Sequence, residues 1–389
     1  MISRFLTFAF LFASLAVFAQ AAPQDVDITS ADGTKLKATY YPAAKPGPGV
    51  LLLHMCNSNR QAWEPVATQL SAAGIHALAL DYRGYGESGG DRFQDDPQKQ
   101  QQVQTEKWPG DIDAAFHYLS KQSGVDKNRI GAGGGSCGVN QAIQVARRHP
   151  EVKSLVLLAG GTGLEGLNYL YNSPWLPILA SSASDDGFDR DPHAGMKWLL
   201  NLSGNPRNRY LAYDRGGHGT QMFKPNPDLP KQIVAWYVET LVKKPADSES
   251  SVARKKTPEA EFWAALNSPG GAEKAAQMFR DARMRDPEAS PAPQQVVNQI
   301  AYDRMQSGNT KDAVTLAKLN VEAFPESANA YDSLGDAYLA DGQNELALQS
   351  AQKAIEVLPN DQNANDDLKK LIRQSAEDKI AKLKPSASK

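Results

Sequence analysis

The sequence predicts an α/β domain, with a mostly parallel sheet covered by helices on both faces, followed by an all-α domain of repeats. Short apolar runs alternate with helix-length amphipathic stretches from about Asp25 to Val242. Continuous apolar strands separated by helices are typical of a parallel sheet that is buried on both faces. Beyond Thr257 the chain becomes helical, and the same residue types recur at one fixed interval. A length of 389 residues suits two such domains.

The composition excludes several classes of function. The formal net charge is −2, which gives no indication of a nucleic-acid partner. Six histidines and two cysteines occur without a CxxC or HxxxH spacing, so we expect no metal site and no cofactor.

Residues 1–22 have the layout of a secretory signal peptide. Arg4 precedes the apolar run Phe5–Phe18, and Ala19-Gln20-Ala21 is an A-x-A cleavage signal. The run is shorter than the roughly 20 residues that a membrane-spanning helix needs. We therefore expect a periplasmic or secreted protein whose mature form has no membrane span.

The predicted catalytic domain covers residues 23–242, and its strands follow from the apolar runs. A hairpin turn at Asp32-Gly33 joins the first two strands. The predicted strands are Val26–Ser30, Lys35–Tyr41, Val50–His54, Ile75–Asp81, Ile130–Gly133, Val152–Ala159, Leu176–Ser182 and Tyr210–Tyr213. Helices are predicted at Trp63–Ala73, Trp108–Gln122 and Gln141–His149. Residues 243–257, rich in charge, Ser and Pro, are predicted to be a linker, so we expect the chain up to about Leu241 to fold alone.

Gly134-Gly135-Ser136-Cys137-Gly138 fits the G-x-S-x-G pattern and lies between a strand and a helical stretch. A nucleophilic serine on such a turn needs small neighbours, because the strand and the helix pack closely there. Gly133, Gly135 and Gly138 also satisfy the dinucleotide pattern G-x-G-x-x-G, which requires an acidic residue at the end of the next strand. That strand ends in Leu158-Ala159-Gly160-Gly161 without a carboxylate, so the dinucleotide interpretation fails.

A base and a carboxylate follow the serine in the order Ser, Asp, His. His218 lies in Gly216-Gly217-His218-Gly219 after the last predicted strand, and Asp185-Asp186 follows the strand before it. A carboxylate there orients the histidine and stabilises the imidazolium. We assign this role to Asp186 rather than Asp185, because Gly187 supplies the turn that follows.

These residues together resemble the α/β-hydrolase superfamily, whose chain order is also Ser, Asp, His. Asp81-Tyr82-Arg83-Gly84-Tyr85-Gly86-Glu87-Ser88 is similar to the D-x-R-G-x-G-x-S segment of that family, and Leu51–His54 is similar to the strand that opens its oxyanion loop. The resemblance covers about the whole first domain and is closest to lidless, dienelactone-hydrolase-like members. It implies backbone N–H groups of Cys137 and of Met55 or Cys56 as the oxyanion hole. His54-Met55 replaces the usual His-Gly pair, so we expect a less open loop.

Dienelactone hydrolases use a cysteine nucleophile, which makes Cys137 the alternative to Ser136. If Cys137 were the nucleophile, Val139 would stand two positions beyond it, where a β-branched side chain fits the turn poorly. We therefore favour Ser136.

The short segment between Gly161 and Leu176 leaves no room for an inserted lid, so we expect a shallow site bordered by loops such as Leu164–Trp175. Phe93–Thr105 is predicted to be a solvated loop at the rim.

Residues 258–384 carry a helical repeat. Four residue types recur at an interval of 34 residues: Gly308, Ala313, Ala317 and Pro325 recur as Gly342, Ala347, Ala351 and Pro359. This pattern resembles the tetratricopeptide repeat. It predicts repeats at Pro293–Glu326 and Ser327–Asn360, a degenerate pair at Glu259–Asp286, and a capping helix at Asn365–Leu383.

The predicted function is that of an exported serine hydrolase, which cleaves a small-molecule carboxylic ester, or an amide, through an acyl-enzyme. The alternative is a non-catalytic hydrolase-fold scaffold whose repeats bind a protein or peptide partner.

Cys56 and Cys137 both flank the predicted site, and export to an oxidising compartment would permit a disulfide between them. We nevertheless favour two separate buried thiols whose Cβ atoms point apart.

Overall fold

The computed structural model describes residues 22–93, 96–187, 191–246, 252–362 and 364–383. The predicted signal peptide thus lies, apart from Ala22, outside the described residues. One eight-stranded sheet forms the centre of the first region, in the order β1-β2-β4-β3-β5-β6-β7-β8. Its strands are β1 (Gln24–Thr29), β2 (Lys35–Tyr41), β3 (Gly47–Leu53), β4 (His76–Leu80), β5 (Val125–Gly135), β6 (Val152–Leu158), β7 (Ile178–Ala183) and β8 (Arg209–Tyr213). β1 and β2 pair antiparallel and the strands from β4 to β8 pair parallel, which confirms the predicted mostly parallel sheet.

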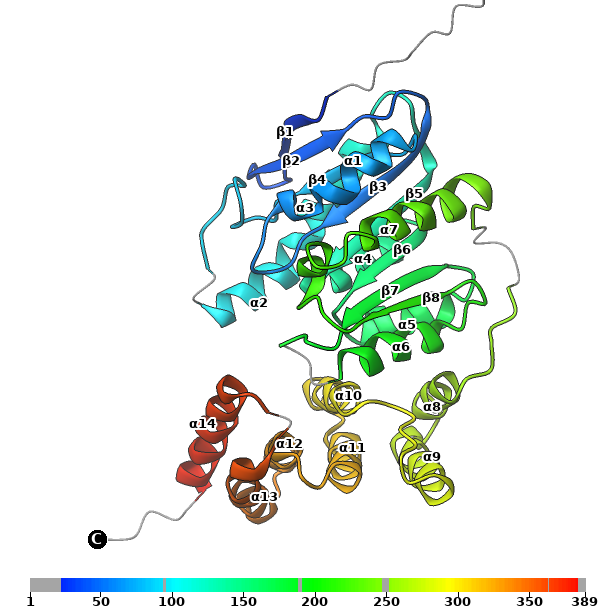
Figure 1. Cartoon of the computed structure of the whole chain (residues 1–389). Coiled ribbons are helices and arrows are strands. Elements are labelled where there is room, and N and C mark those ends of the chain that lie inside the picture. Colours follow the sequence, from blue (N-terminus) through cyan, green and yellow to red (C-terminus); the bar gives the residue numbers. More distant parts are fainter. Residues whose placement is uncertain (1–21, 94–95, 188–190, 247–251, 363, 384–389) are drawn as a thin grey trace, which may run out of the picture.

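Helices cover both faces of this sheet, as the apolar strands predict (Figure 1). The helices of this region are α1 (Glu64–Ala72), α2 (Pro97–Glu106), α3 (Trp108–Ser120), α4 (Cys137–Arg148), α5 (Leu164–Asn172), α6 (Pro192–Ser203) and α7 (Leu229–Tyr237). Val50 and Leu52 of β3 join the core that contains residues of α1 and α7. The alternate residues Leu51 and Leu53 join the core with residues of α3 to α6. This alternation follows from the two-residue period of a strand.

The C-terminal region is helical throughout its regular structure. It comprises α8 (Pro258–Leu266), α9 (Gly271–Arg285), α10 (Gln294–Gln306), α11 (Thr310–Ala323), α12 (Ala328–Ala340), α13 (Asn344–Val357) and α14 (Asp366–Leu383). Each of the two predicted 34-residue units therefore holds a pair of helices. Gly308 and Gly342 occupy equivalent turns with positive φ, 80° and 76°, where only glycine avoids backbone strain.

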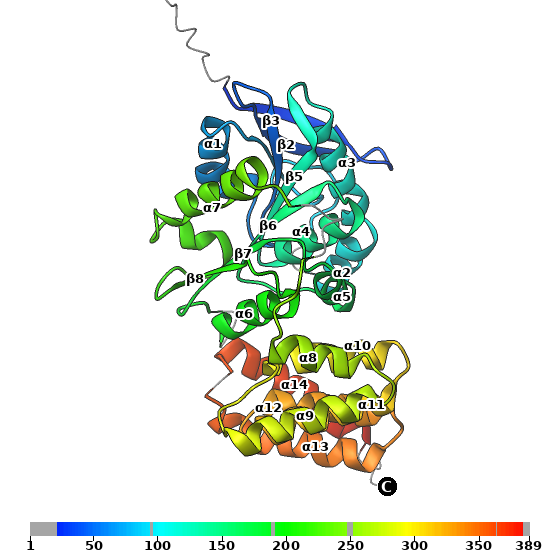
Figure 2. The same cartoon turned by 90° about the vertical axis from the view of Figure 1, so that its right-hand side faces the viewer.

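The helical region packs directly under α5 and α6 (Figures 1 and 2). Trp198 of α6 donates its indole N–H to the Pro291 carbonyl at 3.0 Å. Its ring meets that of Trp263 edge to face, with centroids 6.1 Å apart. The two side chains belong to one continuous apolar core that runs from the sheet into the helices. These contacts argue against the expectation that the chain up to about Leu241 folds by itself.

The stretch predicted to be a linker also makes specific contacts. The Arg254 guanidinium lies 3.7 Å from the ring centroid of Tyr171 in α5. Thr257 donates its hydroxyl to the Asn201 carbonyl at 2.8 Å and caps α8 by accepting from the Ala260 N–H. The described part of this stretch is therefore attached to α5 and α6 just before α8 begins.

Replacing Trp263 by alanine is expected to lower the free energy of unfolding by about 3–5 kcal/mol, because a fully buried indole is removed at the junction of the two regions. Guanidinium denaturation of the full chain, followed by tryptophan fluorescence and by circular dichroism, measures the loss. Met284→Ala is the control, since that side chain is 75% exposed on α9 and its loss is expected to cost less than about 0.5 kcal/mol. Equal stability of the two variants would contradict a shared core.

Candidate active site

Ser136 lies on a sharp turn between the end of β5 and the first residue of α4. Its φ of 54° and ψ of −122° place it in a region that non-glycine residues rarely adopt. A Cβ at Gly134 would stand 1.9 Å from the carbonyl oxygen of Gly138. A Cβ at Gly138 would stand 2.5 Å from the carbonyl oxygen of Leu53. Gly134 is therefore required by the close approach of β5 to α4, and Gly138 by the close approach of α4 to β3.

His218 and Asp186 are brought together on two loops beside this turn. The His218 Nδ1 lies 2.7 Å from a carboxylate oxygen of Asp186. The Asp186 side chain is only 1% exposed and that of His218 is 12% exposed, so bulk water scarcely competes for their contact. A carboxylate in this position holds Nδ1–H and leaves Nε2 to accept a proton.

The Ser136 turn and the His218 loop are neighbours. A Cβ at Gly219 would stand 3.5 Å from the Ser136 backbone nitrogen, and Gly219 follows His218 directly. The serine, the histidine and the carboxylate thus gather at the carboxyl ends of β5, β7 and β8, as predicted. Their catalytic roles remain predictions.

Asp185 has a structural task that the sequence did not reveal. One of its carboxylate oxygens accepts from the N–H groups of Gly216 and Gly217, at 2.7 and 2.8 Å. These bonds lower the pKa of the Asp185 carboxyl, with that from Gly217 contributing most. Asp185 therefore fixes the backbone that carries His218, whereas Asp186 contacts the imidazole.

The predicted oxyanion loop follows β3 and is held by His54. The backbone N–H of Tyr82 donates to His54 Nε2 at 3.1 Å, so Nδ1 carries the proton and donates to the Met55 carbonyl at 2.6 Å. Burial lowers the pKa of His54 to about 4, which keeps this ring neutral. Thr220 N–H lies 3.3 Å from the Met55 sulfur, and this contact ties the oxyanion loop to the His218 loop.

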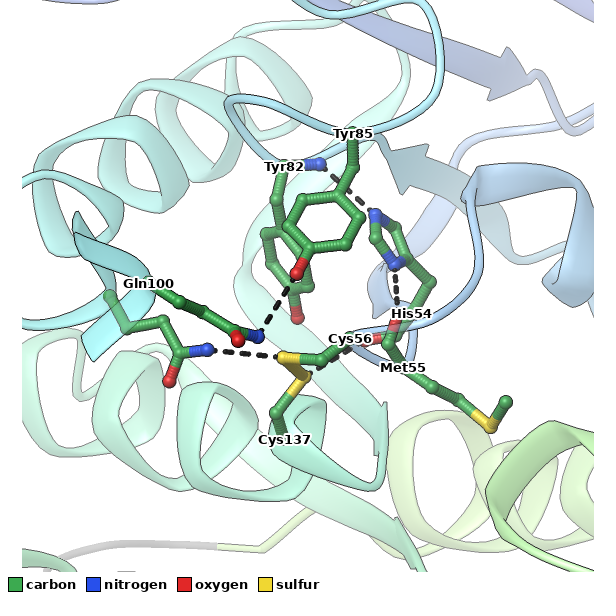
Figure 3. The surroundings of a disulfide bond; sticks show 8 residues. His54, Met55, Cys56, Tyr82, Tyr85, Gln100 and Cys137 are labelled. Atoms are coloured by element: carbon green, nitrogen blue, oxygen red, sulfur yellow. Dashed lines mark hydrogen bonds between the residues drawn. A yellow bond between two sulfur atoms is a disulfide. The ribbon is translucent and has the colours of Figure 1, made fainter. Parts of the chain in front are cut away.

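Cys56 and Cys137 form a disulfide, with their Cα atoms 5.9 Å apart (Figure 3). The expectation of two separate thiols is wrong, because α4 begins close enough to the loop after β3 for the two side chains to meet. The bond also removes Cys137 as a nucleophile, since a disulfide sulfur carries no thiolate. Cys137 was predicted to supply one oxyanion N–H group and either Met55 or Cys56 the other, so the bridge joins the two segments that carry these groups.

The glutamine-rich segment is not a solvated loop over its whole length. Residues 97–106 form α2, and Asp96 caps this helix by accepting from the Lys99 N–H. Gln104 lies 3.2 Å from the Cys56 sulfur, and Gln100 donates to the Tyr85 hydroxyl at 3.1 Å. The helix therefore packs against the disulfide loop (Figure 3).

A cavity of about 320 Å³ lies beside His218 and Asp186. Helices line it: Leu167 of α5, Met196 and Leu199 of α6, and Val296 of α10. The expectation of a shallow site bordered by loops is wrong for two reasons. Residues 164–172 form the helix α5 and not a loop. In addition, α10 of the C-terminal region lines the cavity, although no lid is inserted between β6 and β7.

The described part of the chain holds no cluster of three or more His, Cys, Asp or Glu side chains suited to a metal ion. Within that same part, no helix combines the length and the apolar character needed to cross a bilayer.

Comparison with known proteins agrees with this geometry. A family model described as serine aminopeptidase, S33, matches residues 44–184. The sheet region has the α/β-hydrolase fold, and residues 44–184 are similar to that family. Its sheet, its strand–Ser136–helix turn and the histidine after the last strand are the features that the superfamily shares.

Two curated relatives and one solved structure illustrate how far the similarity reaches. Uncharacterized protein Rv2307c of Mycobacterium tuberculosis is 34% identical over 160 residues, 40% of this chain and 52% of that protein. Thiohydrolase aneE of Aspergillus aculeatus is 30% identical over 133 residues, 34% of this chain and 40% of that protein. The chain thus spans about half or less of these relatives' own length. The Pyrococcus furiosus esterase Pf2001 has 20% identity and a TM-score of 0.47, and the match covers 57% of this chain and 91% of that one.

Asp186→Asn is expected to lower kcat about 10⁴-fold, because an amide cannot fix the proton on Nδ1 of His218. Asp185→Asn is expected to change kcat less than about tenfold, since its amide oxygen still accepts from Gly216 and Gly217. Steady-state hydrolysis of a p-nitrophenyl ester measures both. The assignment fails if Asp185→Asn is the crippling change and Asp186→Asn the mild one.

Reduction of the disulfide is expected to lower kcat with little change in unfolding cooperativity, because the bridge holds the start of α4 against the loop that carries the other candidate oxyanion donors, Met55 and Cys56. Thiol titration of denatured, non-reduced protein should find no free thiol. The double variant Cys56→Ser/Cys137→Ser is the control, since dithiothreitol should not alter its activity further. Two free thiols before reduction would contradict the bridge.

Proposed function

We propose that the protein is an exported serine hydrolase that cleaves a carboxylic ester through an acyl-enzyme at Ser136. The observation that carries the proposal is the buried Asp186–His218 contact beside the Ser136 turn and an open cavity. A histidine so oriented is suited to take a proton from a serine hydroxyl.

The mechanism follows from the position of each group. The Ser136 Oγ attacks the ester carbonyl carbon while His218 Nε2 takes the hydroxyl proton. Backbone N–H groups of Cys137 and of Met55 or Cys56 stabilise the tetrahedral oxyanion. The C–O bond to the alcohol then breaks, and His218 returns the proton to the leaving oxygen. Water repeats the sequence on the acyl-enzyme, releasing the acid and restoring Ser136.

An ester is the first choice of substrate because its alkoxide leaving group needs less assistance from His218 than an amine does. Thioesters and amides undergo the same acyl transfer, and the names of a relative and of the matching family point to these two classes. Export is proposed from the layout of residues 1–22. The Cys56–Cys137 disulfide supports this proposal, because such bonds persist in oxidising compartments. The C-terminal helices are proposed to be tetratricopeptide-like from their recurring residues.

A fluorophosphonate probe is expected to label the purified, folded protein at Ser136, because only an activated serine attacks the phosphorus at a useful rate. Ser136→Ala should abolish labelling and ester hydrolysis, whereas Ser184→Ala, at a serine outside the proposed triad, should retain labelling. Peptide mass spectrometry locates the adduct. Absence of labelling on well-folded protein would favour a non-catalytic scaffold, and a panel of p-nitrophenyl butyrate, its thioester and its anilide ranks the substrate classes.

A further inference from the structure

The C-terminal helical region reaches the candidate active site at two separate places. Gln295, Val296 and Gln299 of α10 line the cavity that also contains His218. Asn365, just before α14, donates its side-chain amide to the carbonyl of Gly187 at 3.1 Å. Gly187 directly follows Asp186, so this second contact falls on the loop of the predicted triad carboxylate.

The position of α10 is fixed by contacts on its other side. Val297 and Ile300 are buried in the core shared with the sheet region. The Asp303 carboxylate makes a polar contact with the backbone N–H of Leu164 at the start of α5, and another with Gln299. Pro291, just before the helix, accepts the indole N–H of Trp198. The residues of α10 that line the cavity therefore stand on a helix anchored to both α5 and α6.

The chemistry of the cavity restricts what it can hold. Its helical walls are mostly apolar, with Leu167, Met196, Leu199 and Val296. The side-chain amides of Gln295 and Gln299 add neutral hydrogen-bonding groups. Among the described lining residues, Asp186 and His218 are the only ones with titratable side chains. A volume of about 320 Å³ lies at the lower end of the usual range for ligand pockets.

We propose that α10 is the cap of the active site and a determinant of its specificity. In this arrangement Val296 limits the length of one uncharged, mostly apolar arm of the ester, and Gln295 and Gln299 border its outer end. The proposal rests on the proposed function. It gives the C-terminal helices a role within the same chain, at the position where other hydrolases insert a lid.

The test changes the size of residue 296 in the full-length protein. Val296→Trp is expected to lower kcat/KM at least about tenfold more for a long-arm ester than for p-nitrophenyl acetate. The affected ester is p-nitrophenyl octanoate if the acyl arm enters the cavity and octyl acetate if the alcohol arm does. Val296→Ala should shift the preference in the opposite direction. Gln306→Trp is the matched control, because Gln306 is exposed at the far end of the same helix and does not line the cavity. Parallel profiles of Val296→Trp and wild type for both long-arm esters would overturn the proposal.

A binding measurement separates this inference from the proposed activity. Saturation-transfer NMR of ethyl octanoate with Ser136→Ala should show contact, and Ser136→Ala/Val296→Trp should weaken the signal. If these signals appear although the wild type neither labels nor hydrolyses, the proposed hydrolase function fails while the capped pocket stands. If the wild type hydrolyses esters but position 296 changes neither binding nor selectivity, the cap is overturned and the hydrolase stands. Absence of ethyl octanoate binding to Ser136→Ala also overturns the cap.

Discussion

The close approach of β5, α4 and β3 at Ser136 is the constraint from which the candidate site follows. Ser136 holds a φ of 54° because Gly134 and Gly138 leave no side chain between the turn and its neighbours. The same closeness brings the start of α4 to the loop after β3, where Cys137 meets Cys56. In the chain-entropy model, a bridge over a separation of 81 residues stabilises the fold by about 4 kcal/mol. The bridge itself lies next to the strained turn, since Cys137 directly follows Ser136.

The order of elements and the residues that gather at the site were predictable because each depends on a local signal. Strand periodicity, the glycines around Ser136 and the turn after Asp186 all act over a few residues. The disulfide was not predictable in the same way, since it depends on the direction of two Cβ atoms 81 positions apart. The helix over residues 97–106 was missed because its glutamines carry no apolar stripe.

The residues of α10 that line the cavity were not predictable from the sequence. Val296 and Gln299 belong to a helix whose own sequence shows only a repeat pattern. The contacts that place α10 at the site are the hydrogen bond from Trp198 to Pro291, just before the helix, and the Asp303 contact with α5. Both of these join residues far apart in the chain, so neither residue of a pair reveals the other in the sequence.

Anchoring a cap through a shared core has a physical consequence that an inserted lid does not have. A lid that is attached by two hinge strands can open without breaking the core of its parent domain. Here Val297 and Ile300 of α10 are buried in the core shared with α6 and α8, and Pro291 just before the helix accepts from Trp198. Opening α10 would therefore break that hydrogen bond and expose Val297 and Ile300. That exposure would cost several kcal/mol. Substrate entry through rigid-body motion of α10 is therefore disfavoured, and the cavity is better described as preformed, with its selectivity set by the side chains that line it.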